Sequence, residues 1–360
     1  MPAGPARFSI PGFVVNSSND PTPSRHAPGP VGVALVGHGY WGRHLARNVV
    51  AAPSTTLVGV VDIDEQALAR ASRIHLGVET WTHLEAALED DRVEAIVVAT
   101  PASTHADIAA KALESDRHVL VEKPLAASEP EAVDLVARAR EKRLTLMVGH
   151  TFLYSVPVNR LRDWIGSGEL GRVRHVRSQR MSIGRVRHDV NALWNLAPHD
   201  LSILLYLLEE RPVAVSSLGF SFVREGIEDV CTASLEFASG VVATVHVSWA
   251  DPVKTRLMTV VGDEKMAIYD DLSPERPLAL VDNGGLALTS IEDPATSGDP
   301  LIPTLDLVEP LLLEITDFGE ACATGRIPKA SAEQGLDVVR ILAALDRSMR
   351  DRGNPVMIEW

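Results

Sequence analysis

The chain has 360 residues, of which 46% are hydrophobic and 23% are charged, and its formal net charge is −14. This length exceeds what one core ordinarily supports, so we expect two domains in a protein of ordinary globular composition. The acidic balance argues against a nucleic-acid partner, which needs concentrated Lys and Arg side chains to neutralise phosphates.

The sequence gives only weak indications of a membrane-spanning helix, of an export signal or of a metal site. No apolar run approaches the ~20 residues that a membrane-spanning helix needs, so we expect no membrane span. The amino terminus has no basic segment followed by an apolar stretch, and we expect a cytoplasmic protein. Cys231 and Cys322 lack metal-ligand spacing. They are expected to be reduced, buried thiols, and we predict no metal site.

Residues 1–30 contain seven prolines among Ser, Asn and Gly residues and show no hydrophobic periodicity. Such a composition buries too little apolar surface to offset the entropy lost on ordering the chain. We therefore predict a mostly disordered arm. The alternative is an arm that lies over a neighbouring subunit.

A glycine-rich turn follows the first apolar run, in the segment VGVALVGHGYWG at residues 31–42. Gly37 permits a tight turn, Gly39 lets the backbone approach a pyrophosphate, and Gly42 lets a helix pack closely on the strand. The diphosphate would lie over the free N–H groups at the helix start, where the helix dipole is positive. The segment therefore predicts a dinucleotide site.

An acidic residue, Asp62, follows Gly42 by twenty positions, at the end of the next predicted strand. Its carboxylate can accept two hydrogen bonds from the adenosine ribose diol, whereas its charge would repel a 2′-phosphate. We therefore predict NAD(H) as the cofactor rather than NADP(H). Tyr40 and Trp41, within the glycine turn, are further candidate cofactor contacts.

Short β-rich runs alternate with helical patterns from residue 31 to about residue 149. The predicted strands are residues 31–36, 57–62, 95–100, 118–121 and 144–148. The predicted helices are residues 41–52, 65–74, 83–88, 105–115 and 130–142. Such alternation is typical of βαβ crossovers, so residues 31–150 are predicted to form an α/β domain with a doubly wound parallel sheet of the Rossmann type.

The pattern changes in residues 151–360, where several strands follow one another without helices between them. The predicted strands are residues 173–183, 213–223, 231–237, 241–250, 255–261, 265–269 and 278–281. The predicted helices are residues 156–167, 198–208, 307–324 and 332–350. We expect an α+β domain with a large, mainly antiparallel sheet. One face of this sheet must be covered, by helices or by another subunit, and the last helices can pack back on the first domain.

Glu122, Lys123 and Pro124 come directly after the predicted strand at residues 118–121. Ligands of an open α/β sheet bind beyond the carboxyl ends of its strands, and Pro124 keeps Lys123 out of a helix. Lys123 could there hydrogen-bond a reacting oxygen and stabilise developing alkoxide charge. The alternative is a surface lysine paired with Glu122.

The segment VATPASTH, residues 98–105, contains the end of another predicted strand and the start of the next predicted helix. Thr100 and Pro101 would line the nicotinamide-ribose side of the cofactor, and Ser103 or Thr104 can cap the helix. The alternative is a capped turn without any ligand contact. The candidate cofactor contacts around the two strand ends are Thr100, Pro101, Ser103, His105, Glu122 and Lys123.

The segment LWNLAPHD places His199 near a predicted helix start. The unperturbed pKa of imidazole suits proton transfer near neutral pH, although a histidine at a helix start is ordinarily only a polar end residue. Asn195 lies one helical turn earlier if the helix has begun there. Asp200 points about 100° away from His199 in a helix and is expected to be structural. His38 and His150 are expected to be scaffold, surface or at most cofactor contacts.

Together these motifs resemble the glucose–fructose oxidoreductase / inositol dehydrogenase (Gfo/Idh/MocA) family of NAD(P)-dependent enzymes. The resemblance runs from residue 31 to about residue 356, through GHGYWG, VVATPASTH, VEKPLA, GSGELGRV, PHD and TGRIPKASAEQGLDVVR in this order. It implies hydride transfer between NAD(H) and a secondary alcohol or ketone of a sugar or cyclitol. LWNLAPHDLSILLYLL and VGDEKMAIYDD are most similar to members that act on sugars, often nucleotide-linked ones; an aminoglycoside is a further option.

The resemblance also implies roles for single residues. Lys123 matches the lysine that orients the substrate hydroxyl and shares in proton transfer, and His199 matches the histidine that acts as general acid/base. Many members carry Asp where this chain has Asn195, and an amide cannot stabilise an imidazolium by charge, which leaves more of the proton work to Lys123. The candidate substrate contacts are Tyr154, Trp194, Asn195 and Arg185.

Two alternatives stay open on the sequence: an NADP(H)-dependent sugar ketoreductase, and a non-catalytic NAD-binding regulator on the same fold. A basic subsite near Lys123, from Arg180, Arg185 or Arg187, would indicate a nucleotide-linked sugar, and a neutral pocket would indicate a free glycoside or cyclitol. We also expect a homodimer or homotetramer, because a wide sheet with an open face usually finds a partner.

Overall fold

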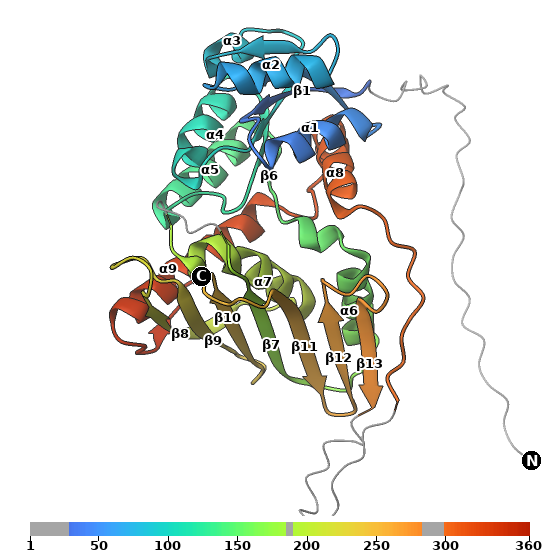
Figure 1. Ribbon diagram of the computed structural model, residues 1–360, viewed down its shortest axis with the longest axis vertical. Helices are drawn as coiled ribbons and strands as arrows, with labels where there is room; N and C mark the ends of the chain where they lie inside the picture. The colour runs from blue at the N-terminus through green and yellow to red at the C-terminus, as the bar shows by residue number, and fades with distance from the viewer. Residues whose placement is uncertain (1–28, 185–189, 283–298) are drawn as a thin grey trace, which may run out of the picture.

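The computed structural model describes residues 29–184, 190–282 and 299–360. Most of the predicted amino-terminal arm therefore lies outside the described residues. Figure 1 shows an α/β domain above a second domain built on a broad sheet. The chain enters the upper domain first and returns to it with α8 near its carboxyl end.

Six parallel strands form the sheet of the first domain, in the order β3-β2-β1-β4-β5-β6. The strands are β1 (Val31–Val36), β2 (Thr55–Val61), β3 (Glu79–Trp81), β4 (Ala95–Val98), β5 (His118–Val121) and β6 (Leu146–Val148). The helices are α1 (Gly42–Ala51), α2 (Glu65–Ile74), α3 (Leu84–Leu88), the 3-10 turn η1 (Ala102–Thr104), α4 (His105–Glu114) and α5 (Glu129–Lys142). The predicted doubly wound sheet is confirmed, and its strand order reverses between β1 and β4, where such sheets bind ligands.

Strand β1 shows why these strands appear in the sequence as continuous apolar runs. Val33 and Leu35 belong to one buried cluster, whereas Ala34 and Val36 belong to the other. Successive side chains of a strand point to opposite faces of its sheet, so a strand covered on both faces needs apolar residues throughout. The short edge strand β3 lacks such a run, and the sequence did not predict it.

Eight strands form the sheet of the second domain, in the order β13-β12-β11-β7-β10-β9-β8-β14. They are β7 (Val173–Met181), β8 (Pro212–Phe220), β9 (Val230–Phe237), β10 (Val242–Ser248), β11 (Thr255–Gly262), β12 (Lys265–Asp270), β13 (Leu278–Asp282) and β14 (Val356–Met357). Only the pair β7 and β10 is parallel among the described pairings. The predicted large, mainly antiparallel sheet is confirmed.

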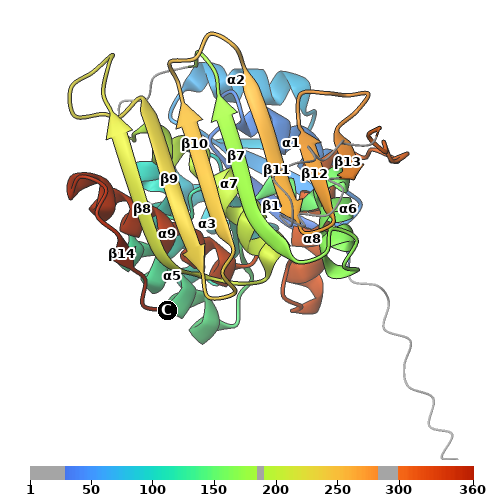
Figure 2. The same ribbon diagram turned by 90° about the horizontal axis from the view of Figure 1, so that it is seen from below.

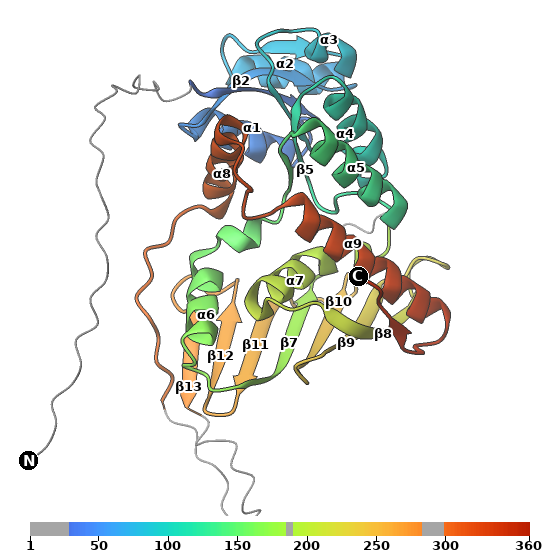
Figure 3. The same ribbon diagram turned by 180° about the vertical axis from the view of Figure 1, so that it is seen from behind.

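Helices cover one face of this sheet and leave the other face open (Figures 2 and 3). The second half of the chain forms the 3-10 turn η2 (Thr151–Tyr154) and the helices α6 (Val156–Gly166), α7 (Ala192–Leu208), α8 (Pro310–Thr324) and α9 (Ala332–Arg350). Helix α8 packs against α1, and α9 packs against both α5 and β8. Leu311, Ile315 and Phe318 of α8 bury their side chains in the same cluster as Leu35. The two domains therefore share one continuous packed junction.

The structure corrects two expectations about helix starts. Helix α7 begins at Ala192, six residues before the predicted start at Pro198, because the Asn191 side chain caps it by accepting a hydrogen bond from the Trp194 N–H at 3.1 Å. Pro198 therefore lies inside the helix. Helix α4 has no side-chain cap, since the Thr104 hydroxyl donates instead to the Pro101 carbonyl at 2.8 Å.

Cys231 is a buried free thiol and Cys322 a half-buried one. No group of three or more His, Cys, Asp or Glu side chains within the described ranges could hold a metal ion. No helix of the described chain is long and apolar enough to cross a membrane.

Candidate active site

The glycine turn after β1 leaves an open space above the start of α1. Gly37 has a φ of +94°, a conformation that side-chain-bearing residues rarely adopt. A Cβ on Gly42 would lie 1.9 Å from the Gly37 carbonyl oxygen, so only glycine lets α1 approach the turn this closely. A Cβ on Gly39, in contrast, would meet no atom within 4 Å. The backbone at Gly39 thus faces space beside a helix N-terminus, which fits the diphosphate of a dinucleotide.

Asp62 lies just beyond β2, beside this turn. Its carboxylate accepts hydrogen bonds from the His38 N–H at 2.6 Å and from the Asp64 N–H at 2.9 Å. Each bond uses a different carboxylate oxygen, and each oxygen retains acceptor capacity for a further donor. Backbone bonds therefore fix the orientation of Asp62, which suits the diol of the adenosine ribose.

Trp41 connects the glycine turn to the tip of β5. Tyr40 is exposed and Trp41 partly so, and the Trp41 indole N–H donates to the Glu122 carboxylate. Glu122 is buried, and this burial raises the pKa of its carboxyl to about 7 despite the opposing effect of the adjacent Lys123. The bond joins the glycine turn after β1 to the loop after β5 across the carboxyl edge of the sheet.

The loop after β4 places its predicted cofactor residues in two different environments. Pro101 and Ser103 are exposed, and Thr100 is partly exposed. His105 is buried, and its two ring nitrogens lie 2.8 Å from the Pro124 carbonyl oxygen and 3.0 Å from that of Thr100. His105 therefore connects the loop after β4 to the loop after β5, and each of its ring nitrogens has a carbonyl hydrogen-bond partner.

Lys123 reaches across to the second domain. Its ammonium donates a hydrogen bond to the Asn195 carbonyl of α7, with an N–O distance of 2.8 Å. Pro198 has no N–H to give to the Trp194 carbonyl one turn earlier, and its ring crowds that carbonyl. The helix is thus disturbed at the point where Lys123 meets it. The structure brings a lysine of the first domain and α7 of the second domain together.

His199 lies in the interior of α7, a full turn after the carbonyl that Lys123 contacts. Its ring packs edge-on against Phe152 of η2, with 5.0 Å between centroids, and its Nδ1 atom is buried without a hydrogen-bond partner among the described residues. Burial lowers the pKa of His199 well below its usual range, and the charges of Lys123 and Arg180 lower it further. The imidazole is therefore uncharged at neutral pH.

His150 is a site residue that sequence reasoning treated as scaffold, surface or at most a cofactor contact. It follows β6, the strand that pairs with β5, so His150 and Lys123 leave the sheet at neighbouring strand ends. The ring is buried, and neither nitrogen has a partner within the described chain. Burial, and then the Lys123 charge, lower the pKa of His150 to about 3. A histidine two residues after a buried strand was the available signal.

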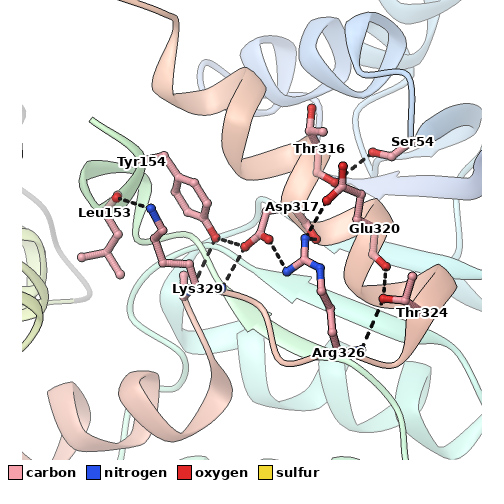
Figure 4. Close-up of polar contacts among 10 residues, drawn as sticks. Ser54, Leu153, Tyr154, Thr316, Asp317, Glu320, Thr324, Arg326 and Lys329 are labelled. Carbon is pink, nitrogen blue, oxygen red and sulfur yellow. Dashed lines mark hydrogen bonds and ion pairs between the residues drawn. The ribbon is translucent and has the colours of Figure 1, made fainter. Parts of the chain in front are cut away.

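Tyr154 lies in another cluster, at the junction of η2 with α8 and α9 (Figure 4). Its hydroxyl donates to Asp317 at 2.5 Å and accepts from the Ala330 N–H at 3.3 Å. Arg326 forms an ion pair with the same carboxylate, and the Lys329 ammonium lies 5.4 Å from the centre of the Tyr154 ring. The buried Tyr154 therefore ties the two domains together here, and its hydroxyl is not brought to Lys123 and His199.

The other predicted substrate contacts are dispersed. Trp194 is buried at the edge of a cavity of about 350 Å³ that Glu228 and Asp346 also line. Asn195 is half-buried and meets Lys123 through its backbone carbonyl rather than through its side chain. Arg185 lies outside the described residues, as does Arg187. Arg180, the third candidate for a basic subsite, is buried in an ion pair with Asp200.

Comparison with known proteins assigns each of the two domains to a family model. Residues 31–150 match the family model for the oxidoreductase family with an NAD-binding Rossmann fold, and residues 158–268 match the Gfo/Idh/MocA C-terminal domain. The chain belongs to the Gfo/Idh/MocA oxidoreductase family. The first matched range contains the glycine turn, Asp62, Lys123 and His150, and the second contains His199. Helices α8 and α9 lie beyond both matched ranges.

Characterised members of the Gfo/Idh/MocA family resemble the chain over most of its length. It is 28% identical to UDP-N-acetylglucosamine 3-dehydrogenase of Acidithiobacillus ferrooxidans, over 66% of this chain and 74% of that protein. It is 25% identical to the NAD⁺-dependent scyllo-inositol 2-dehydrogenase of Bacillus subtilis, over 91% and 96%. The crystal structure of GenD2 from gentamicin A biosynthesis, in complex with NAD, superposes with a TM-score of 0.77 at 28% identity, over 97% of this chain and 100% of that one.

Proposed function

We propose that this protein transfers a hydride between NAD(H) and a secondary alcohol or ketone of a sugar or cyclitol. The observation that carries the proposal is the meeting of Lys123, from the first domain, with the His199 helix of the second domain. This meeting lies at the carboxyl edge of the sheet, beyond β5 and β6. Bound NAD would supply the hydride acceptor or donor at its nicotinamide ring.

Lys123 and His199 would have different roles in substrate binding and proton transfer. Lys123 would hold the substrate oxygen and stabilise the negative charge that develops on it. His199 is half-buried, and desolvation together with the nearby cations keeps its imidazole uncharged, so it would accept a hydrogen bond from the substrate hydroxyl. An imidazole with so low a pKa retains a proton poorly at neutral pH, so Lys123 carries the larger share of the proton work.

The arginine pairing favours a free sugar or cyclitol over a nucleotide-linked sugar. Arg180 is the described member of the three predicted basic residues, and Asp200 already neutralises its charge inside the protein. A diphosphate would need a cation with remaining donors for its oxygens. We therefore propose a cyclitol or an unphosphorylated glycoside, including an aminoglycoside, as the substrate class.

A panel of substrates tests the function. Purified protein is incubated with NAD⁺ or NADP⁺ and with inositols, aminocyclitol glycosides, simple glycosides and UDP-N-acetylglucosamine, while absorbance at the NADH band is recorded. We expect turnover with NAD⁺ on a cyclitol or glycoside, and little with NADP⁺ because of the Asp62 charge. Tight NAD binding without turnover on any compound would instead indicate a regulator, and preferred turnover of the UDP-sugar would overturn the substrate class.

The uncovered face of the second sheet supports a homodimer or homotetramer. Leu218 and Phe220 of β8 and Val242 of β10 are 48%, 53% and 40% exposed, respectively. We expect light scattering coupled to gel filtration to give at least twice the monomer mass at micromolar concentration. A Leu218→Glu, Phe220→Glu variant should shift the mass toward the monomer, and a monomeric mass for the unmodified chain would contradict the assignment.

A further inference from the structure

A buried ion pair lies directly behind His199. Asp200, the next residue of α7, accepts hydrogen bonds from Arg180 Nε at 2.8 Å and from an Arg180 terminal nitrogen at 3.2 Å, and from the Ser178 hydroxyl at 2.7 Å. The Arg180 and Asp200 side chains are only 7% and 3% exposed. Ser178 and Arg180 are two residues apart on β7, so both point to the face that α7 covers. The guanidinium therefore has a fixed position and orientation.

Phe152 connects this ion pair to the imidazole. The Arg180 guanidinium carbon lies 4.7 Å from the centre of the Phe152 ring, in a cation–π contact. The same ring meets the His199 ring at 5.0 Å between centroids, with an angle of 74° between the planes. The contacts thus run without a break from Asp200 through Arg180 and Phe152 to His199, and they join β7, η2 and α7.

We propose that Arg180 and Phe152 are positioning residues for His199, with the clamped guanidinium holding the phenyl ring and the phenyl ring holding the imidazole. Asp200 closes this stack because it follows His199 directly and fixes Arg180 by two hydrogen bonds. The inference rests on the proposed role of His199 in catalysis. In this proposal Arg180 positions another side chain and does not bind a phosphate.

The stack has an electrostatic consequence in addition to its geometric one. The charged and titratable groups that act on His199 come from four elements: Lys123 after β5, His150 after β6, Arg180 on β7 and Arg256 on β11. Arg256 is opposite Arg180 in the sheet register and is paired with Asp271 at 2.8 Å. The guanidinium of Arg180 is always protonated, so it disfavours an imidazolium nearby at every working pH. Removing this charge therefore raises the pKa of His199.

The test compares Arg180→Met, Arg180→Lys and Phe152→Leu, with Arg174→Met as a matched control on the same strand. Arg174 is an exposed arginine that pairs with Asp263, so its loss should change nothing. The His199 resonance is followed by NMR in the substrate-free protein and assigned through its loss in His199→Gln. We expect Arg180→Met to raise the midpoint by about one pH unit, whereas Arg180→Lys keeps the charge and leaves it nearly unchanged.

Kinetics test the geometric half of the proposal. Arg180→Lys and Phe152→Leu should lower kcat about tenfold with little change in KM, since misplacing a catalytic group affects the chemical step. Phe152→Tyr, which keeps the ring, should restore the rate. In Arg180→Met the acid side of the pH–rate profile should move upward together with the NMR midpoint.

Removing Arg180 alone leaves Asp200 buried without its cation, which can prevent folding. The double variant Arg180→Met, Asp200→Asn removes both charges together, so the His199 midpoint should change little there, whereas kcat should still fall because the phenyl ring loses its support. An unchanged kcat in that folded variant would overturn the proposal. The NMR titration needs no substrate, so a shifted midpoint in a protein that oxidises no sugar would refute the proposed function and leave the stack standing.

Discussion

Replacing Lys123 by alanine is expected to lower turnover by at least about 100-fold, the usual scale for losing a general acid–base group. The reason is geometric as well as chemical. The Lys123 ammonium is a charged group of the first domain that touches α7, where it lies 2.8 Å from the Asn195 carbonyl oxygen. Alanine would leave the developing alkoxide without its nearest cation, and the neutral His199 cannot supply that charge. Steady-state kinetics with the best substrate of the panel measure the loss.

The affinity for NAD should stay nearly constant in Lys123→Ala, because the glycine turn and Asp62 are intact. Lys111→Ala is the matched control, since Lys111 is an exposed lysine of α4 that forms a surface ion pair with Glu85. This control should retain full turnover. Near-normal turnover of Lys123→Ala would remove the catalytic assignment of the lysine.

Replacing Gly39 by valine is expected to abolish NAD binding without unfolding the protein. A Cβ at Gly39 meets no atom within 4 Å, so the free chain accommodates the new side chain. The valine would then occupy the space that we assign to the diphosphate. We expect the Kd for NAD, measured by calorimetry, to rise at least about 100-fold, which corresponds to about 2.7 kcal/mol.

Gly42→Ala separates this effect from a general loss of structure. A Cβ there would lie 1.9 Å from the Gly37 carbonyl oxygen, and a backbone atom cannot move aside cheaply. We expect this variant to lose about 3 kcal/mol or more of its free energy of unfolding, seen as a lowered Tm. NAD binding of Gly39→Val at the level of the unmodified protein would show that the diphosphate does not lie over this turn.

The local elements were largely accessible from the sequence, for reasons visible in the structure. Strand β1 is apolar at every position because both of its faces are buried, and the adjacent glycine turn has a backbone that only glycine adopts easily. Helices α2 and α9 begin and end at the predicted residues, and in each a polar N-cap side chain accepts a backbone N–H. At these elements the signal was local, and the prediction agreed with the structure.

The start of α7 shows where local reasoning failed. The predicted helix begins at Pro198, a residue type that is common in the first turn of a helix. In the structure the helix begins after its cap at Asn191, so its first turns contain Trp194 and Asn195. Pro198 then lies in the helix interior. The carbonyl that receives Lys123 belongs to these first turns. The predicted helix therefore did not contain the residue that Lys123 contacts.

The sequence by itself determined the type and order of most elements, the dinucleotide turn and the identity of the two candidate catalytic side chains. The sequence left open whether the last helices pack back on the first domain, and the structure shows that α8 does. Only the tertiary structure decided that Tyr154 binds Asp317 and that Arg180 binds Asp200 rather than a ligand. Periodicity is a property of neighbouring residues, so a sequence displays it directly. A hydrogen bond between side chains that are 163 residues apart depends on how separate elements pack, and no local pattern encodes which partner a buried charge will find.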